Sequence, residues 1–78
     1  MLLEKMRNAV VEGDTELVIE LVERAITEGM NPLNILDNGL VPGMDEVGRL
    51  FRESEMFVPE ELMSANAMQA GNNLLKPL

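Results

Sequence analysis

The chain has few side chains that could perform chemistry. It contains no histidine and no cysteine, which excludes disulfide bonds and thiolate ligands and removes the commonest general base and metal ligand. The densest carboxylate cluster consists of Glu53, Glu55, Glu60 and Glu61. A di-metal site in a helical bundle would combine such carboxylates with Glu-x-x-His pairs, which this sequence cannot supply. We interpret the cluster as a solvated connector and an acidic first helical turn, and expect no catalytic residue and no metal ligand.

Apolar side chains offer a different chemistry, namely contact with a flat ligand or a partner. Phe51 and Phe57 are the only aromatic residues, and they lie on either side of a polar stretch. One interpretation makes both rings anchors of a small hydrophobic core, because aromatic side chains bury large areas. The other makes them an apolar rim for a ligand or partner, which the seven methionines support because flexible thioethers suit adaptable surfaces. The residue pattern leaves both interpretations open.

The charge balance limits the partners of the chain. Fourteen acidic residues against six basic ones give a formal net charge of -8. This balance disfavours nucleic acid and anionic membranes, which attract clustered Lys and Arg. No apolar run approaches the roughly 20 residues that span a bilayer, and the first residues lack the features of a secretory signal. We therefore expect a cytoplasmic protein with no nucleic-acid or membrane partner.

Helical patterns run along the whole chain. The spacing of apolar residues and of helix-starting prolines predicts helical segments over residues 2–12, 15–28, 32–40, 44–51 and 59–76. Asp14 and Asn31 are expected to cap helix N-termini, and Gly13 and Gly29 are expected just past helix C-termini. Pro42 predicts a kink or a fresh start, because proline disfavours helical geometry in the residue before it.

The predicted fold class is all-α, a small antiparallel four-helix-type bundle. Strand-like alternation is absent and the connections are short, which favours antiparallel helices. Hydrophobic residues make up 46% and charged residues 26% of the chain, a globular balance, and 78 residues suffice for one domain with a thin core. Residues 64–71 (SANAMQAG) are almost all small or flexible. We interpret them as a site of tight helix packing, although they would also let another backbone approach.

The block LFxxxxMFVPEELM at residues 50–63 carries a resemblance to a known family. With its surroundings, NPLNILDNGLVPGMDEVGR before it and SANAMQAGNNLLKPL after it, the block resembles the helical cap of corrinoid methyl-carrier proteins. Such caps occur in methionine synthase and in the corrinoid subunits of methyltransferases that act on methylamines, methanol or aryl methyl ethers. The upstream stretch AVVEGDTELVIELVERAITEGM also fits the first helical pair of this module. The resemblance therefore covers nearly the whole chain.

The resemblance implies a cofactor and a set of contacts. In that family the bundle lies over the upper face of cobalamin, bound as methylcobalamin, and two apolar side chains shield the methyl group from water. The matching positions here are Phe51 and Val58. The family often has Leu at the second position, and Val58 is one methylene shorter. Phe57 and Met63 belong to the same block and are the further expected cofactor contacts.

The resemblance also implies a missing half. The family holds its cofactor in an α/β domain whose Asp-x-His-x-x-Gly motif supplies the lower cobalt ligand, whereas this chain has no histidine. We therefore expect residues 1–78 to be the helical cap alone, without the α/β cobalamin-binding domain. Such a cap would not be catalytic by itself. Its expected partners are an α/β cobalamin-binding domain and methyltransferase subunits.

Two other functions remain open at this point. The chain could cap an adenosyl cofactor in a cobalamin-dependent sensor or transcriptional regulator, where similar bundles occur. It could also be a helical interaction module that forms a homo-oligomer. The second alternative follows from the apolar patch expected around Phe51, Phe57, Val58 and Met63, because exposed patches of this kind find partners.

Overall fold

Within residues 1–77, which the computed structural model describes, the chain forms helices joined by short connections. The expected domain boundary at residue 78 lies outside the described residues. The elements in chain order are α1 (Leu2–Glu12), α2 (Thr15–Thr27), α3 (Pro32–Ile35), the π-helix η1 (Leu36–Leu40), α4 (Val41–Arg52) and α5 (Val58–Leu75).

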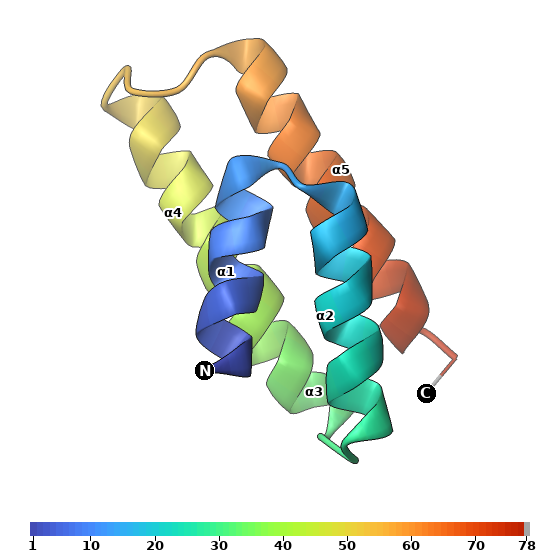
Figure 1. Cartoon of the computed structure of the whole chain (residues 1–78). Coiled ribbons are helices and arrows are strands. Elements are labelled where there is room, and N and C mark those ends of the chain that lie inside the picture. The colour runs from blue at the N-terminus through green and yellow to red at the C-terminus, as the bar shows by residue number, and fades with distance from the viewer. Residues whose placement is uncertain (78) are drawn as a thin grey trace.

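The helices run up and down beside one another (Figure 1). α3, η1 and α4 follow one another without a break, so residues 1–77 contain four helical rods. The bundle measures 38 × 18 × 17 Å along its principal axes. Figure 1 shows α3 at one end of the bundle and the connector between α4 and α5 at the other. The predicted all-α antiparallel bundle is confirmed, and none of the described helices is both long and apolar enough to cross a membrane.

Local side-chain chemistry sets the ends of the first helices. The Asp14 carboxylate accepts a hydrogen bond of 3.1 Å from the Leu17 N–H at the start of α2. The Asn31 side chain accepts one of 2.8 Å from the Leu33 N–H at the start of α3. Gly13 and Gly29 follow α1 and α2 with φ angles of 69° and 82°, which other residues adopt only with strain. All four predicted end signals are thus confirmed.

Pro42 does not start a new helix. The rod from α3 to α4 continues through it, and the departure from α-helical bonding lies just before it in η1. There the Val41 N–H donates to the Leu36 carbonyl, five residues back instead of four. Proline lacks an N–H and its ring crowds the carbonyl four residues earlier, so an α-helix cannot pass it unchanged. The widened π turn takes up this misfit.

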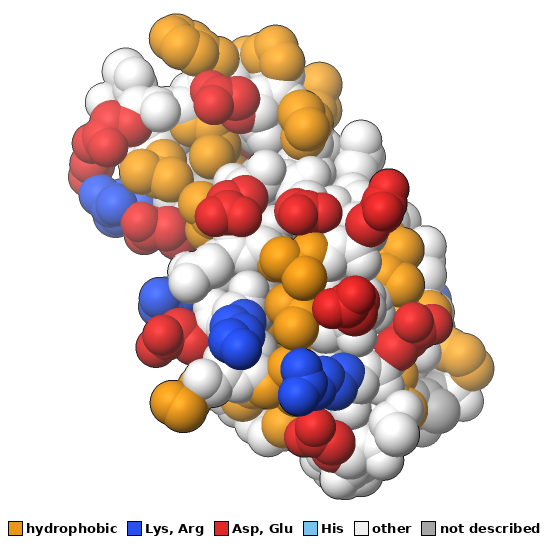
Figure 2. All heavy atoms as spheres, in the orientation of Figure 1, with side chains coloured by type: hydrophobic (Ala, Val, Ile, Leu, Met, Phe, Trp, Pro, Cys, Tyr) orange, Lys and Arg blue, Asp and Glu red, His pale blue; other side chains and the backbone are white. Residues whose placement is uncertain are grey.

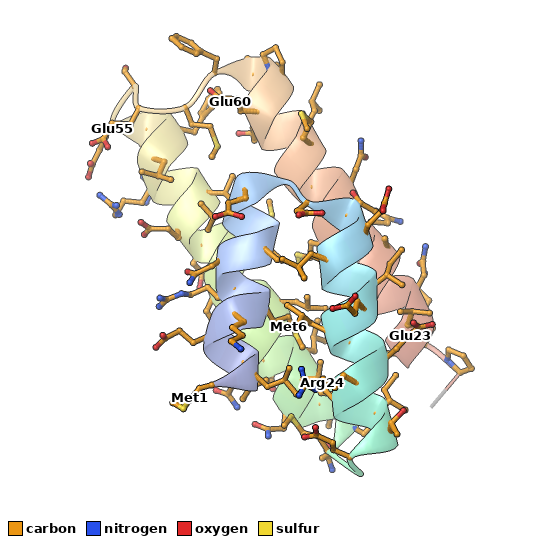
Figure 3. All side chains as sticks on the ribbon, viewed as in Figure 1. Met1, Met6, Glu23, Arg24, Glu55 and Glu60 are labelled. Carbon is orange, nitrogen blue, oxygen red and sulfur yellow. The ribbon has the colours of Figure 1, made fainter. Side chains whose placement is uncertain are left out.

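The core is built from small and medium aliphatic side chains of all four rods. Its buried members are Met6, Ala9, Val10, Val18, Leu21, Val22, Ala25, Ile35, Leu40, Ala67 and Leu75. Figure 3 shows Met6 inside the bundle, between α1 and the rods behind it. Leu33 is 67% exposed at the α3 end, because it belongs to the first turn of the rod, before the helices close together.

The small residues of α5 pack tightly, as their composition predicts. Ser64, Ala67 and Gly71 are buried along one side of the helix. The Ser64 hydroxyl donates a hydrogen bond of 3.0 Å to the Val11 carbonyl. A Cβ atom at Gly71 would lie only 2.9 Å from Cγ1 of Val18. The stretch 64–71 therefore lets α5 approach α1 and α2 closely within this chain.

Candidate functional site

Exposed hydrophobic side chains gather at the end of the bundle where α4 connects to α5. Among the described residues, seven large hydrophobic side chains are exposed, and five of them fall between positions 51 and 63. These five, which we call the apolar end, are Phe51, Phe57, Val58, Leu62 and Met63. Figure 2 shows hydrophobic side chains clustered at this end of the molecule. The structure therefore brings all four predicted contact residues to one connector and the helix ends beside it.

The two phenylalanines are not core anchors. Phe57 is 71% exposed and Phe51 is 38% exposed. The core interpretation is therefore wrong for both rings. The physical reason is that small residues such as Gly43, Ala67 and Gly71 bring the rods close together, which leaves little room for a ring between them. On α4, Val47 is fully buried, whereas Phe51, one turn further along the same face, lies at the helix end and is only partly covered.

Sequence reasoning missed one member of the apolar end, Leu62, which is 55% exposed. Leu62 follows Val58 by four residues on α5. Side chains at this spacing lie on the same face of a helix. The signal was therefore present in the spacing, because an exposed Val58 implies that Leu62 shares its surface.

The connector that presents Phe57 has a defined backbone. After α4, the Ser54 N–H donates to the Phe51 carbonyl at 3.1 Å, and the Glu55 N–H donates to the Leu50 carbonyl at 2.9 Å. This Schellman pattern puts Ser54 at φ 61°, where a non-glycine residue carries a penalty of about 1–2 kcal/mol. Met56 is only 8% exposed, so its side chain holds the middle of the connector against the bundle.

The start of α5 fixes the backbone of Phe57. Its N–H donates a hydrogen bond of 2.9 Å to Oε1 of Glu60, which lies near the start of α5 in Figure 3. Pro59 occupies the first turn, where its missing N–H leaves no bond unmade. The backbone at residue 57 is thus held while the ring stays in solvent. Glu60 serves the helix end, in agreement with the interpretation of the carboxylate cluster.

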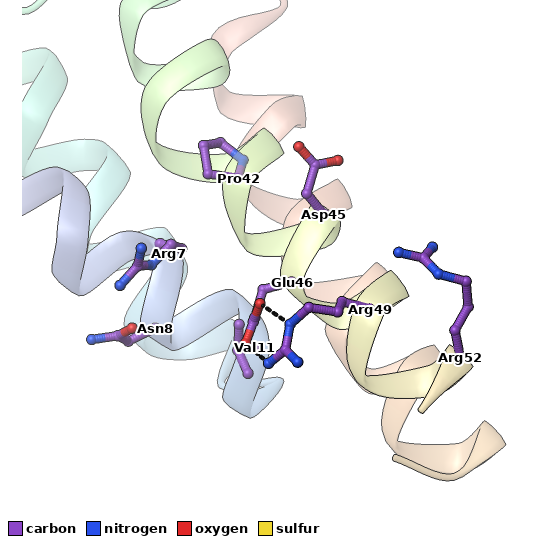
Figure 4. A pocket seen from close by; sticks show the side chains of 8 residues that line it. All are labelled: Arg7, Asn8, Val11, Pro42, Asp45, Glu46, Arg49 and Arg52. Atoms are coloured by element: carbon purple, nitrogen blue, oxygen red, sulfur yellow. Dashed lines mark hydrogen bonds and ion pairs between the residues drawn. The ribbon is translucent and has the colours of Figure 1, made fainter. Parts of the chain in front are cut away.

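Charged side chains form a separate feature between α1 and α4. A groove of about 550 Å³ is lined there by residues that include Arg7, Arg49 and Arg52 (Figure 4). Arg49 bridges two carboxylates, with Nη2 at 2.6 Å from Glu46 and Nη1 at 2.8 Å from Glu53. The hydrogen bond from Arg49 lowers the pKa of Glu46, and its two carboxylate partners raise the pKa of Arg49. None of the five apolar-end residues lines this groove.

The described residues offer no metal-binding chemistry. No group of three or more carboxylates, histidines or cysteines is placed to hold a metal ion within residues 1–77. The same part of the chain has no buried side-chain polar atom without a hydrogen-bond partner. The apolar end can cover a surface and exclude water from it, and its five side chains carry no group that could transfer a proton.

Comparison with known proteins identifies relatives of this bundle. The chain is 40% identical over 75 residues to dimethylamine corrinoid protein 2 of Methanosarcina acetivorans. The aligned region covers 96% of this chain and 34% of that protein. It is 38% identical over 76 residues to a corrinoid protein of Desulfitobacterium hafniense, covering 97% of this chain and 35% of the relative. The chain thus spans about a third of the length of these relatives.

The fold comparison agrees with the sequence comparison. The structure of the monomethylamine corrinoid protein of Methanosarcina barkeri matches with a TM-score of 0.90 at 36% identity, covering 94% of this chain and 34% of that one. A family model described as the B12 binding domain matches residues 2–76. The resemblance carried by residues 50–63 is therefore confirmed, and the chain belongs to the B12 binding domain family, the helical cap of corrinoid proteins.

Proposed function

We propose that this chain is the cap of a methyl-carrier protein and covers the upper face of a cobalamin. One observation carries the proposal: a member of the B12 binding domain family places five exposed apolar side chains at one end of its bundle. An exposed apolar patch at one place on a small domain marks a surface that something else covers.

The residues of the apolar end fit cobalamin as a cover and not as a ligand. Phe51, Phe57, Val58, Leu62 and Met63 carry no histidine nitrogen or thiolate that could bind cobalt. The cobalt ligand and the pocket for the cofactor would therefore come from an α/β domain outside residues 1–78. When bound, the cofactor would supply the methyl-carrying chemistry.

Each side chain of the apolar end has a definite task in this proposal. Phe51 and Val58 lie over the methyl group and keep water from it, since neither can hydrogen-bond to water. Phe57, Leu62 and Met63 extend the apolar cover around them. Glu60 and Met56 hold the backbone of the connector, so the cover is preformed and does not have to be ordered on closing.

The methyl donor is recognised outside the cap in this proposal. Relatives named for monomethylamine, dimethylamine and trimethylamine are 36%, 40% and 36% identical to this chain. Similar identities across different amines are expected if a cap faces the cofactor and a separate methyltransferase binds the amine. Methyltransferase subunits are therefore the proposed partners of the assembled protein.

The proposal can be tested by photolysis of methylcobalamin, followed by its visible spectrum. The chain is mixed with a separately produced α/β cobalamin-binding domain loaded with methylcobalamin. We expect photolysis to be several-fold slower than with the α/β domain alone. We expect Phe51→Ala combined with Val58→Ala to abolish that protection, because the two side chains supply the cover over the methyl group.

The matched control is Leu33→Ala, which removes another exposed leucine side chain at the opposite end of the bundle. It should leave the protection unchanged. Equal photolysis rates with and without the unmodified chain would refute the cap function. Equal loss of protection in the control and the double variant would refute the assignment to the apolar end.

A further inference from the structure

The methionines of this chain fall into three groups by exposure. Met6 and Met56 are buried. Met30, Met44 and Met68 are partly buried and pack against the core. The exposed pair is Met1 at 78% and Met63 at 55%. Met1 and Glu60 lie at opposite ends of the molecule in Figure 3. Met63 is therefore the exposed methionine of the apolar end.

The inner part of Met63 is fixed while its outer part is free. A Cβ atom added to Gly13 would lie 2.9 Å from Cβ of Met63 and 3.3 Å from its carbonyl carbon. The base of the side chain therefore packs against the turn between α1 and α2. The exposed surface must then belong mainly to the distal atoms, which include the thioether sulfur.

A thioether in this position reacts with hydroperoxides. In the reaction with hydrogen peroxide the O–O bond breaks, one oxygen forms a bond to sulfur, and the other leaves as water. The sulfur loses two electrons and the peroxide gains them. The product, methionine sulfoxide, is polar and is no longer suited to an apolar contact.

We propose that Met63 is an oxidation site that switches the apolar end from a covering surface to a non-covering one. A hydroperoxide reaches the Met63 sulfur when the cap is open, and the sulfoxide then opposes closing. A closed cap shields the same sulfur. Closing would remove water from the polar sulfoxide oxygen, which is costly. The effect on capping rests on the proposed function, whereas the selective oxidation of Met63 does not.

The first experiment needs no cofactor. The chain is treated with graded hydrogen peroxide and the added oxygen is located by peptide mass spectrometry. We expect Met63 to be oxidised several-fold faster than Met6 and Met56, with Met1 as the freely exposed comparison. Binding of an uncharged apolar dye such as Nile red should fall as Met63 oxidises. Oxidation of Met6 or Met56 at the same rate as Met63 would overturn the proposal.

The matched variant is Met63→Leu, which removes the sulfur and keeps an apolar side chain of similar volume. Each protein is compared with its own untreated sample. We expect peroxide to reduce dye binding by the unmodified chain and to have no effect on the variant. Circular dichroism checks that the helices persist. An equal loss of dye binding in the variant would show that another site is responsible and would overturn the proposal.

The second experiment adds the methylcobalamin-loaded α/β domain. Oxidised chain should bind it at least about tenfold more weakly than untreated chain, whereas peroxide should not weaken binding by Met63→Leu. If untreated chain fails to protect methylcobalamin, the proposed function is refuted. The mass spectrometry and dye results then still decide whether Met63 is the selective oxidation site. If untreated and oxidised chains cap equally well, the switch is refuted and the cap function stands.

Discussion

Single atoms decide how closely the rods pack. A Cβ atom at Gly43 would lie 2.7 Å from Cβ of Val10 and 3.1 Å from the carbonyl oxygen of Arg7. Neither is the flexible end of a long side chain, so α1 could not accommodate the extra methyl without moving. Gly48, one turn and a half further along α4, faces only the flexible guanidinium of Arg52 at 3.4 Å. The two glycines on one helix thus have opposite structural roles.

This contrast predicts opposite effects of one substitution. Gly43→Ala should lower the free energy of unfolding by about 1–2 kcal/mol, because the steric cost exceeds the gain in helix propensity. Gly48→Ala should raise it by up to about 1 kcal/mol, because only the propensity gain remains. Urea denaturation followed by circular dichroism measures both. A shift of the two variants in the same direction would contradict the close packing of α4 on α1.

The proposed contact residues were predictable to different degrees. The resemblance of the block at residues 50–63 singled out Phe51, Val58, Phe57 and Met63 as expected contacts. Their exposure could not be derived from residue type, because an exposed contact surface and a buried core can both be formed by the same apolar residues at the same helical spacing. Which side of a helix is buried is decided by the other helices.

At the scale of the helices, local signals predicted the ends well and the interruptions poorly. Asp14, Asn31, Gly13 and Gly29 act through hydrogen bonds and φ angles within a few residues, so their roles follow from the sequence. The effect of Pro42 depends on how the neighbouring rods hold the chain. A π turn over Leu36–Leu40 replaces the break, and this turn packs against α1 and α5.

The connector after α4 shows the same limit of local signals. Its Schellman ending puts Ser54, a residue without glycine's freedom, at a positive φ. The sequence predicted only a polar connector there. Met56 explains why this conformation persists, because the buried side chain holds the connector in place once the bundle has formed. Strained backbone of this kind concentrates at functional sites, and here it leads into Phe57.

At the scale of the whole molecule, the two ends of the bundle differ. The end with the α4–α5 connector carries the five apolar-end side chains, whereas the opposite end carries Leu33 as its large exposed hydrophobic residue besides Met1. The formal net charge of -8 keeps like molecules apart in dilute salt. Contact between the apolar ends of two copies of the chain is thus opposed by long-range electrostatic repulsion.

This balance predicts self-association that strengthens with salt. Salt screens the repulsion but leaves the apolar contact intact, so light scattering should show dimers or larger species at high protein concentration and more of them in added salt. Val58→Lys should reduce association, whereas Leu33→Lys, at the other end, should reduce it less. A monomer at all concentrations and salt levels would contradict the prediction.

The most direct test of the cap function is to map where the cofactor domain touches this chain. Backbone amide signals of the ¹⁵N-labelled chain are recorded while a cobalamin-loaded α/β domain is added. Amides of Phe51, Phe57, Val58, Leu62 and Met63 should change first and most, while those of α3 should stay in place. Changes confined to α3 or to the groove between α1 and α4, or no changes at saturating concentrations, would contradict the assignment of the apolar end as the cobalamin-covering surface.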